Sequence, residues 1–296
     1  MNKEISEKQG MIFVFLSGVC WGIGGACGEY ITKHRGFDID ILIPYRLLIS
    51  GIIVLLFCIF RKIKFDFEIF KNKKHLINFL IYSIFGIFFA QYFYFYGVSL
   101  SNAAIATVIQ FIAPVFIILI VCAEEKRLPK INETTAFICV FLGAFLLATN
   151  GDLSRLVISP KAFFVCILAM LGAVANATVP RKLNKIYSPL PVLGYAMTLV
   201  GLVFCLQSKI WLKSFSMDLW LGLAIFWVII IGTVVAFGLY MIGLNKIGAA
   251  KTTVISSNVP IIAALTSHFW LGTSLFAMQI VGFMLIIFAI FLAIKK

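Results

Sequence analysis

The chain has 296 residues, of which 62% are hydrophobic and only 12% are charged. A soluble domain contains about 45–50% apolar and about 25% charged residues, so these figures exclude a soluble globule and indicate a membrane protein. The net charge of +13 is typical both of nucleic-acid-binding proteins and of membrane proteins with basic cytoplasmic loops. The positions of the basic residues therefore have to decide between these classes.

Ten apolar stretches along the chain are long enough to cross a hydrocarbon core, which takes about 20 residues. They lie near residues 11–31, 40–60, 76–97, 103–122, 132–149, 160–179, 190–207, 218–244, 250–268 and 274–294. The first is not expected to be a cleaved signal peptide, because its apolar run is too long and nine further spans follow. The sequence predicts an all-α membrane protein of ten transmembrane helices.

Lys and Arg are distributed unevenly between the two sets of loops. With ten spans both termini share a side, and the loops and termini of that side carry eighteen basic residues against six on the other side. This excess places the N and C termini in the cytoplasm. Because the charge is spread over short loops on one membrane face, we expect the lipid bilayer and not nucleic acid as a partner.

The chain repeats itself at an offset of 146 residues. Between positions 84 and 114, 11 of 31 residues are identical to their counterparts, including Gly, Tyr and Pro. Five spans per half is an odd number, so the second half enters the membrane from the opposite side. The loop with Lys126, Arg127 and Lys130 accordingly corresponds to the uncharged residues 271–274. We predict two inverted five-helix repeats, residues 1–150 and 151–296.

Inverted repeats are a recurring architecture of secondary transporters, in which the substrate binds near the membrane midplane between the repeats and access alternates. Some channels and membrane enzymes also carry repeats. The architecture therefore favours a transporter and leaves a channel or a non-transporting membrane scaffold as alternatives.

Polar residues inside spans are costly in lipid and usually face the protein interior or a cavity. The fourth span carries Ala103, Thr107, Gln110 and Pro114 on one helical face, and the ninth carries Thr253, Ser256, Ser257 and Pro260 with Asn258 nearby. Because these faces are equivalent in the repeat, we expect them to converge as substrate contacts. The alternative is that the hydroxyl groups satisfy carbonyls freed by the prolines, which then only kink each helix.

Aromatic and amide side chains add further substrate-binding candidates. Trp21 and Tyr94 offer stacking surfaces for an aromatic or cationic group, and Trp227 and Tyr240 are also deep enough to be candidates. Asn176 lies at membrane depth in the sixth span, which favours a polar cavity contact or a hydrogen bond between helices.

Two charged residues lie within or near spans. Arg46 is about six residues into the second span and either reaches the headgroups, bonds a helix end or attracts an anionic substrate group. Glu29, near the end of the first span, either pairs with Arg46 or carries a coupling proton. Both are candidates for charge recognition or coupling.

The sequence contains no enzyme signature. The three His and seven Cys have no metal-binding spacing, and there is no P-loop or paired intramembrane carboxylate. The Cys residues are read as small packing residues. We therefore predict no catalytic residue, no metal and no cofactor.

Several of these motifs together resemble the drug/metabolite transporter superfamily, specifically its EamA-type branch. They are Trp21-Gly22, Arg46, Tyr94-x-x-Gly97 followed by Ala103-Ala104, and a Pro in each fourth-type span. The resemblance covers nearly the whole chain, but Thr273 or Ser274 stands where that family often has an acidic residue. It implies export or exchange of small metabolites, often amino acids, across the bacterial inner membrane by a multi-pass protein. The implied cavity is lined by the first, third, fourth, sixth, eighth and ninth spans. The oligomeric state stays open, and a monomer is compatible with the sequence.

Overall fold

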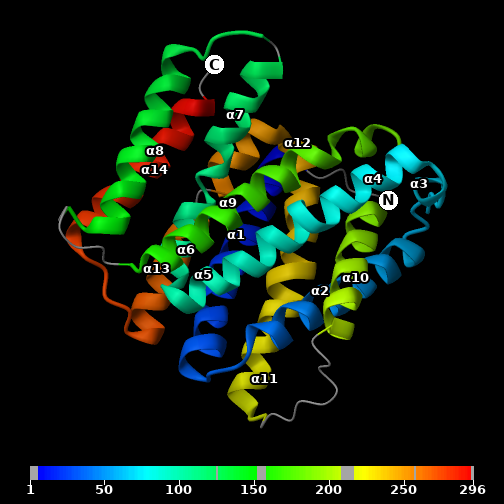
Figure 1. The fold of residues 1–296 in the computed structure, drawn as a ribbon, viewed down its shortest axis with the longest axis horizontal. Helices are drawn as coiled ribbons and strands as arrows, with labels where there is room; N and C mark the ends of the chain where they lie inside the picture. Colours follow the sequence, from blue (N-terminus) through cyan, green and yellow to red (C-terminus); the bar gives the residue numbers. More distant parts are fainter. Residues whose placement is uncertain (1–5, 125, 152–157, 208–216, 257, 295–296) are drawn as a thin grey trace.

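The computed structural model describes residues 6–124, 126–151, 158–207, 217–256 and 258–294, and all regular structure in these ranges is helical (Figure 1). The first half contains α1 (Glu7–Glu29), η1 (Tyr30–His34), α2 (Ile39–Phe60), α3 (Glu68–Lys71), α4 (Lys73–Ile81), η2 (Tyr82–Phe93), α5 (Tyr94–Leu100), α6 (Ala103–Gln110), α7 (Ala113–Glu124) and α8 (Ile131–Thr149). The second half contains α9 (Pro160–Thr178), η3 (Val179–Arg181), η4 (Leu183–Lys185), α10 (Pro189–Gln207), α11 (Leu219–Phe226), η6 (Trp227–Val235), α12 (Ala236–Ser256), α13 (Asn258–Leu271) and α14 (Ala277–Ile294).

Seven of the described helical stretches are long and apolar enough to cross a membrane. They are Glu7–His34, Ile39–Phe60, Lys73–Leu100, Ala103–Glu124, Pro160–Lys185, Pro189–Gln207 and Leu219–Gly248. Two shorter apolar stretches are Ile131–Gly143 and Ala277–Ala289. The prediction of an all-helical protein with several membrane spans is confirmed at this level.

Polar side chains mark where several helices begin. Ser6 accepts a hydrogen bond from the Gln9 backbone N–H, and the Gln9 side chain accepts one from the Ser6 backbone N–H in return. Asp38, Asn102 and Asp218 accept hydrogen bonds in the same way at the starts of α2, α6 and α11. These caps satisfy backbone donors that have no partner within the helix, so the loops between spans can be short.

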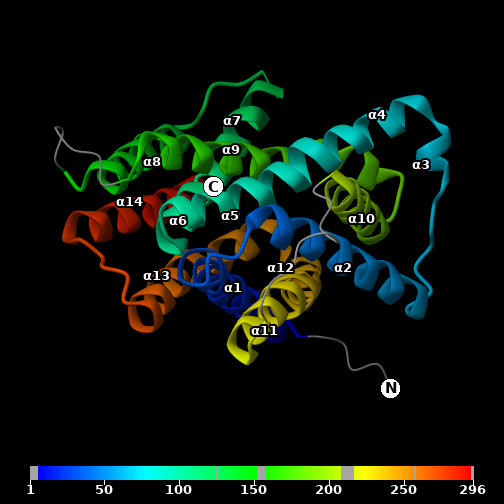
Figure 2. The ribbon, with the colours of Figure 1, turned by 60° about the horizontal axis from the view of Figure 1, so that its bottom comes forward.

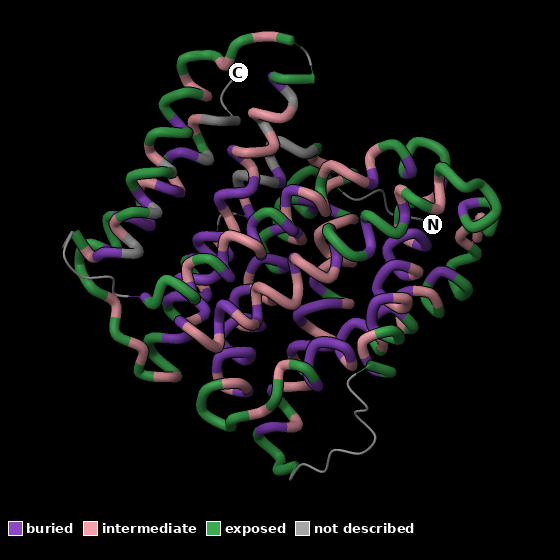
Figure 3. The backbone as a smooth tube through the Cα atoms, viewed as in Figure 1, coloured by how far each residue is buried: buried purple, intermediate pink, exposed green. Residues whose placement is uncertain are grey.

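Helix α1 lies at the centre of the bundle. It packs against α12, α13 and η6 of the second half and against α5 and α6 of the first. Buried residues gather in this central region, while exposed residues are frequent along the outlying α8 (Figure 3). Helix α1 is therefore one of the places where the two halves meet.

The remaining helices form pairs around this centre. Helix α2 packs on α10, α9 packs on η2, and α8 packs on α14 at the edge of the molecule (Figures 1 and 2). The outward sides of α8 and α14 carry exposed apolar side chains such as Phe141 and Met284. Exposed apolar surface on an all-apolar helix suits contact with lipid.

Close helix contacts occur at glycines that match between the halves. Gly243 lies against Val14, and Gly97 lies against Cys166. Gly232 likewise lies against Gly24, and Gly86 against Asn176. Val14 and Cys166 are 152 residues apart, and so are Gly24 and Asn176. The contact of α1 with the eighth span is thus reproduced by the contact of α9 with the third.

The predicted span near 103–122 is not one continuous helix. Helix α6 ends at Gln110 and α7 begins at Ala113. Pro114 has no backbone N–H and cannot continue the hydrogen-bond pattern of α6. The helix is therefore interrupted at residues 111–112, and the single polar face from Ala103 to Pro114 stays a prediction.

The predicted span near 250–268 is helical on both sides of residue 257, which lies outside the described residues. Helix α12 passes through Gly248, whose φ of 79° is a backbone conformation that favours glycine, and is described as far as Ser256. Helix α13 is described from Asn258, two residues before Pro260. Since Gly248 corresponds to Asn102 at the offset of 146 residues, each half has a non-helical residue directly before its fourth-type span.

The third-type helix of each half contains a π-helical segment. These segments are η2 in the first half and η6 in the second, and they overlap at the offset of 146 residues. In η6 the Thr233 hydroxyl donates to the carbonyl of Val228, five residues earlier (2.8 Å). Such wide turns are rare and often occur at functional sites.

Candidate functional site

Arg46 lies at the junction of the two halves. Its Nε donates to Thr233 Oγ1 in η6 (2.9 Å), and its Nη1 donates to Gln91 Oε1 in η2 (2.9 Å). The guanidinium carbon is 4.7 Å from the centre of the Phe95 ring, and the residue is only 5% exposed. The side chain therefore turns inward, to one π-helical segment of each half, and not toward the membrane surface.

Glu29 has other partners. Its carboxylate accepts hydrogen bonds from the Ala103 backbone N–H (2.9 Å), Ser267 Oγ (2.9 Å) and Thr273 Oγ1 (3.1 Å). These four residues form the Glu29 junction, which joins the end of α1 to the start of α6 and the end of α13. The predicted Glu29–Arg46 pair is not what the structure shows, because each side chain is held by a different set of helices.

Tyr94 and Thr107 meet beside α1. Their hydroxyl groups share a hydrogen bond of 2.8 Å. A methyl group on Gly25 would lie 2.5 Å from the Tyr94 hydroxyl, so only glycine lets α1 approach this pair. The structure thus brings together two of the predicted substrate contacts, from α5 and α6.

The polar groups of the fourth and ninth spans differ in how they are satisfied. Gln110 Nε2 donates to the carbonyl of Ala90 (3.0 Å), which ties the end of α6 to η2. Asn258 Nδ2 donates to the carbonyl of Phe15 (3.0 Å), while Asn258 Oδ1 is buried and has no hydrogen-bond partner among the described residues. Ser256 Oγ is also buried without such a partner. Within the described part of the chain, the ninth span therefore has two buried polar atoms without a partner, and Asn258 lies against Gly18 of α1.

The aromatic candidates of the first and eighth spans pack on one another. The Trp21 ring lies 5.2 Å from the Tyr240 ring and 5.3 Å from the Phe237 ring. Trp227 Nε1 donates to the carbonyl of Cys20 (3.3 Å). Together they form an aromatic wall between α1 and the eighth span.

Three other candidates lie apart from this group or cannot be placed. Asn176 packs with its backbone against Gly86, between α9 and η2. Thr253 lies in α12, but its side chain is outside the part that the structure describes, and Ser257 is outside the described residues. Pro114 lies in the first turn of α7, and Pro260 lies in α13, two residues after Asn258.

Sequence reasoning missed three residues around Arg46: Gln91, Phe95 and Thr233. Gln91 is an amide within an apolar and aromatic stretch, which is a signal that could have singled it out. Thr233 and Phe95 have no comparable signal, because a hydroxyl can be satisfied within its own helix and Phe is the commonest aromatic residue in the chain.

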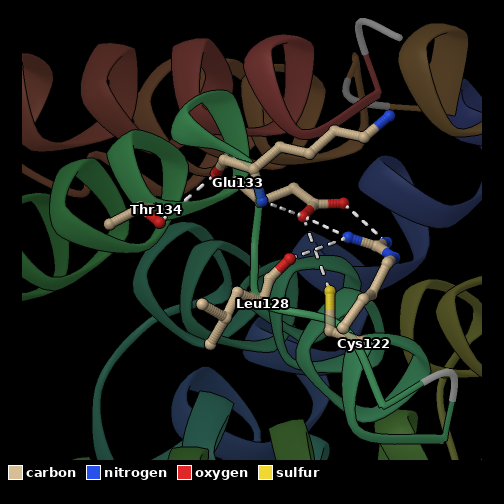
Figure 4. A network of polar contacts seen from close by, with 6 residues as sticks. Cys122, Leu128, Glu133 and Thr134 are labelled. Atoms are coloured by element: carbon tan, nitrogen blue, oxygen red, sulfur yellow. Dashed lines mark hydrogen bonds and ion pairs between the residues drawn. The ribbon is translucent and has the colours of Figure 1, made fainter.

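A cluster of polar contacts away from the centre has a structural role (Figure 4). Glu133 at the start of α8 accepts two hydrogen bonds from Arg127 (2.8 and 3.0 Å) and one from the Lys130 backbone N–H (2.6 Å). Cys122 Sγ also donates to this carboxylate (3.5 Å). The cluster closes the turn between α7 and α8, so we assign it no role in binding.

An open cavity of about 320 Å³ lies beside the end of α1. It is lined by Thr32, Phe37, Asp38, Ile39, Asp40, Tyr92, Tyr96 and Ser99. Tyr92 donates a hydrogen bond to Asp40 (2.7 Å) across it. None of the candidates from the sequence lines this cavity.

Apolar spans packed around a central helix, with buried polar groups between the halves, define a polytopic membrane protein with an internal site. The model of the EamA-like transporter family matches residues 8–149 and 160–295. The chain belongs to the EamA-like transporter family. It is a membrane transporter built from two EamA repeats, which confirms the resemblance seen in the sequence.

Individual relatives agree with this family. The chain is 33% identical over 287 residues to the uncharacterized inner membrane transporter YicL of Salmonella typhimurium (strain LT2), covering 97% of this chain and 95% of that protein. It is 21% identical over 299 residues to the uncharacterized transporter YcbK of Bacillus subtilis (strain 168), covering 95% and 91% of the two chains. A solved crystal structure matches with a TM-score of 0.66 at 15% identity over 97% of this chain and 96% of that one, which shows the fold alone.

Proposed function

We propose that the protein is a secondary transporter that exports or exchanges small metabolites, amino acids or related compounds, by alternating access. The observation that carries this proposal is that polar side chains of the fourth-type helices of both repeats, Thr107 and Asn258, lie against α1, where the two halves meet. In secondary transporters, substrate sites typically lie near the membrane midplane between the repeats.

The full topology consists of ten spans with both termini in the cytoplasm. Beyond the seven long apolar stretches, α8 and α14 have 19 and 18 residues, or about 27–28 Å at 1.5 Å per residue, which suits a thin hydrocarbon core. The tenth comprises the described helical residues Ala249–Ser256 and Asn258–Leu271. The excess of Lys and Arg on the loops of one side supports the cytoplasmic placement of the termini.

The two halves, residues 1–150 and 151–296, are inverted copies. The matching helix contacts support this, because α1 meets the eighth span through Val14 and Gly243 as α9 meets the third through Cys166 and Gly97. In both pairs the two helices run in opposite directions. Gly24 follows Val14 along α1, but its partner Gly232 precedes Gly243, and Asn176 and Gly86 are related to Cys166 and Gly97 in the same way. Rocking of one half against the other would exchange these related contacts.

Substrate binds between the halves, beside α1. Thr107, Gln110, Ser256 and Asn258 supply hydrogen bonds, and Trp21, Tyr94, Trp227 and Tyr240 supply aromatic surfaces. The buried atoms Ser256 Oγ and Asn258 Oδ1, which have no partner among the described residues, are the strongest support, because a buried polar atom without a partner is costly unless a ligand or water satisfies it. Asn176, Thr253 and Ser257 complete the set as peripheral contacts.

The Glu29 junction closes the external side of this site. It joins the ends of α1, α6 and α13 on the membrane face opposite to the termini, and its carboxylate is only 2% exposed. Outward opening must separate these helices and expose Glu29. The membrane is the bacterial inner membrane, in agreement with the name of the Salmonella relative.

Counterflow in proteoliposomes tests the transport function. Vesicles with the purified protein, preloaded with one unlabelled amino acid, are diluted into the same amino acid in labelled form at low concentration, and a panel of amino acids and other metabolites is tested in turn. A carrier gives a transient, saturable accumulation of label. A channel gives flux without counterflow and a scaffold gives no flux, and either result across the panel would overturn the proposal.

A further inference from the structure

Arg46 is a buried cation whose partners are all neutral. Its contacts are the Thr233 hydroxyl, the Gln91 amide oxygen and the face of the Phe95 ring. Among the described residues, no carboxylate forms an ion pair with it. A charge inside a membrane span is costly and is usually paired or placed on a substrate pathway.

The guanidinium group is held in place with donors to spare. Arginine has five N–H donors, and Arg46 uses two of them, one on Nε and one on Nη1. Gln91 offers its amide oxygen to Arg46, which leaves its NH₂ group available as a donor. The Thr233 hydroxyl is fixed by its own bond to Val228, so the orientation of the guanidinium group is set before any ligand arrives.

The position of Arg46 suits a ligand of the transport pathway. It bridges η2 of one repeat and η6 of the other. Ser50, one turn further along α2, donates to the carbonyl of Ile229 in η6 (3.2 Å) and anchors the same stretch of helix. A ligand on Arg46 therefore contacts the surface where the two repeats meet, which is where binding can be coupled to their relative movement.

We propose that Arg46 binds the carboxylate of the transported substrate, with Gln91 donating a further hydrogen bond and Phe95 forming the floor beneath the guanidinium group. This inference rests on the proposed transport function and names its substrate class as small monocarboxylates, amino acids included. A planar guanidinium group matches a carboxylate through two parallel hydrogen bonds. One cation balances one negative charge, which favours a monocarboxylate over a phosphate dianion.

The test compares acids with their neutralised analogues. The melting temperature of the purified wild-type protein is measured with L-leucine and L-phenylalanine, with L-leucinamide and L-phenylalaninamide, with acetate and with inorganic phosphate. We expect at least one carboxylate to raise the melting temperature and its amide not to, since only a ligand that binds the folded state stabilises it. Stabilisation by acid and amide alike, by phosphate alone, or by no carboxylate would overturn the proposal.

Variants of Arg46 and Thr233 distinguish a role of Arg46 in carboxylate recognition from a purely structural role. Arg46→Gln should weaken the carboxylate response about 10- to 100-fold in apparent affinity, the effect of losing hydrogen bonds to a charged group, while Arg46→Lys keeps part of it. Thr233→Val keeps the charge and removes one of the two hydrogen bonds that orient it, so it should lose clearly less affinity than Arg46→Gln. An equal loss in Thr233→Val and Arg46→Gln would show that Arg46 is only a structural bridge. If Arg46→Gln does not fold, the comparison of acid with amide on wild-type protein decides alone.

Counterflow distinguishes failure of this inference from failure of the proposed function. Substrate-dependent counterflow that is equal in wild type and Arg46→Gln leaves the carrier intact and removes the carboxylate site. Absence of counterflow by wild type for every compound of the panel removes the carrier itself.

Discussion

Polar residues inside the bundle fall into two groups, those that form their hydrogen bonds within their own helix and those that form them with other helices. Ser17, Ser83 and Thr178 donate to carbonyls three or four residues earlier on the same helix. Such hydroxyls carry little information about function, because they need no outside partner. Glu29 and Arg46 instead form hydrogen bonds with residues of other helices, so their positions depend on how several helices pack together.

Sequence reasoning found the charged and amide residues of the site but not their partners. Arg46 and Glu29 stood out because a charge in an apolar span is rare. Their partners Gln91, Thr233 and Ser267 come from distant parts of the chain, so no local pattern could have joined them. The predicted Glu29–Arg46 pair failed for this reason: opposite charge on neighbouring spans does not fix which helix faces which.

The amide of Asn258 gives a prediction for one residue. Its Nδ2 holds the carbonyl of Phe15, and its Oδ1 is buried without a partner among the described residues. If substrate uses Oδ1, Asn258→Ala should lower apparent affinity in counterflow by about 2- to 10-fold, the effect of one neutral hydrogen bond.

The matched control for Asn258→Ala is Ser17→Ala, which removes a buried hydroxyl that is satisfied within α1. It should transport like wild type. Both proteins should insert into the membrane in normal amount, as judged from the level of monodisperse purified protein. Wild-type affinity in Asn258→Ala would remove this residue from the site.

The sequence predicted the positions of the helices well, but it did not predict their internal hydrogen-bond geometry. Hydropathy locates apolar stretches because lipid demands them, and each predicted span has a helical counterpart in the described residues. It does not report hydrogen-bond register, so the π-helical segments η2 and η6 were invisible in the sequence. The prolines indicated a disturbance of the fourth-type helices, but a kink has the same sequence signature as the interruption that separates α6 from α7.

The contacts of the Glu29 junction give a prediction for whole elements. Glu29→Gln removes the charge, and its amide group can no longer accept all three hydrogen bonds from Ala103, Ser267 and Thr273. A loss of about 1.4 kcal/mol in this closed arrangement would raise the population of the outward-open state about tenfold. In a cysteine-free protein carrying Ala103→Cys, we expect labelling by a membrane-impermeant maleimide from the external side to increase accordingly.

The control for Glu29→Gln is Ser99→Ala. The Ser99 hydroxyl donates to the carbonyl of Tyr96 within its own helix at the same end of the bundle, so its loss leaves the junction intact. Labelling of Ala103→Cys should stay low in that background. Equal labelling with and without Glu29→Gln would show that the junction does not close the external side.

At the scale of the whole molecule, the internal repeat was the most informative feature of the sequence. The offset of 146 residues correctly marks two EamA repeats, and it also relates backbone details that were not predicted. Lys126 and Gly272, which are 146 residues apart, both have positive φ (51° and 68°) at the turn that follows the fourth-type helix. The turn geometry is repeated although one turn is basic and the other is uncharged. The backbone path is set by the way the preceding helix ends, whereas the charge of a loop depends on its side of the membrane.

Inversion of the two repeats gives the final prediction. Leu128 and Ser274 are exposed, lie in equivalent turns and are 146 residues apart. With inverted repeats these turns lie on opposite membrane faces, whereas repeats of the same orientation place them on one face. In a protein with all seven native Cys replaced, Ser274→Cys should react with an impermeant maleimide in intact spheroplasts, and Leu128→Cys should react only after permeabilisation. Because the two sites are matched in exposure and in turn geometry, a difference in labelling reports their side of the membrane. Reaction of both from the same side would contradict the inverted topology, and with it the exchange of equivalent contacts on which alternating access depends.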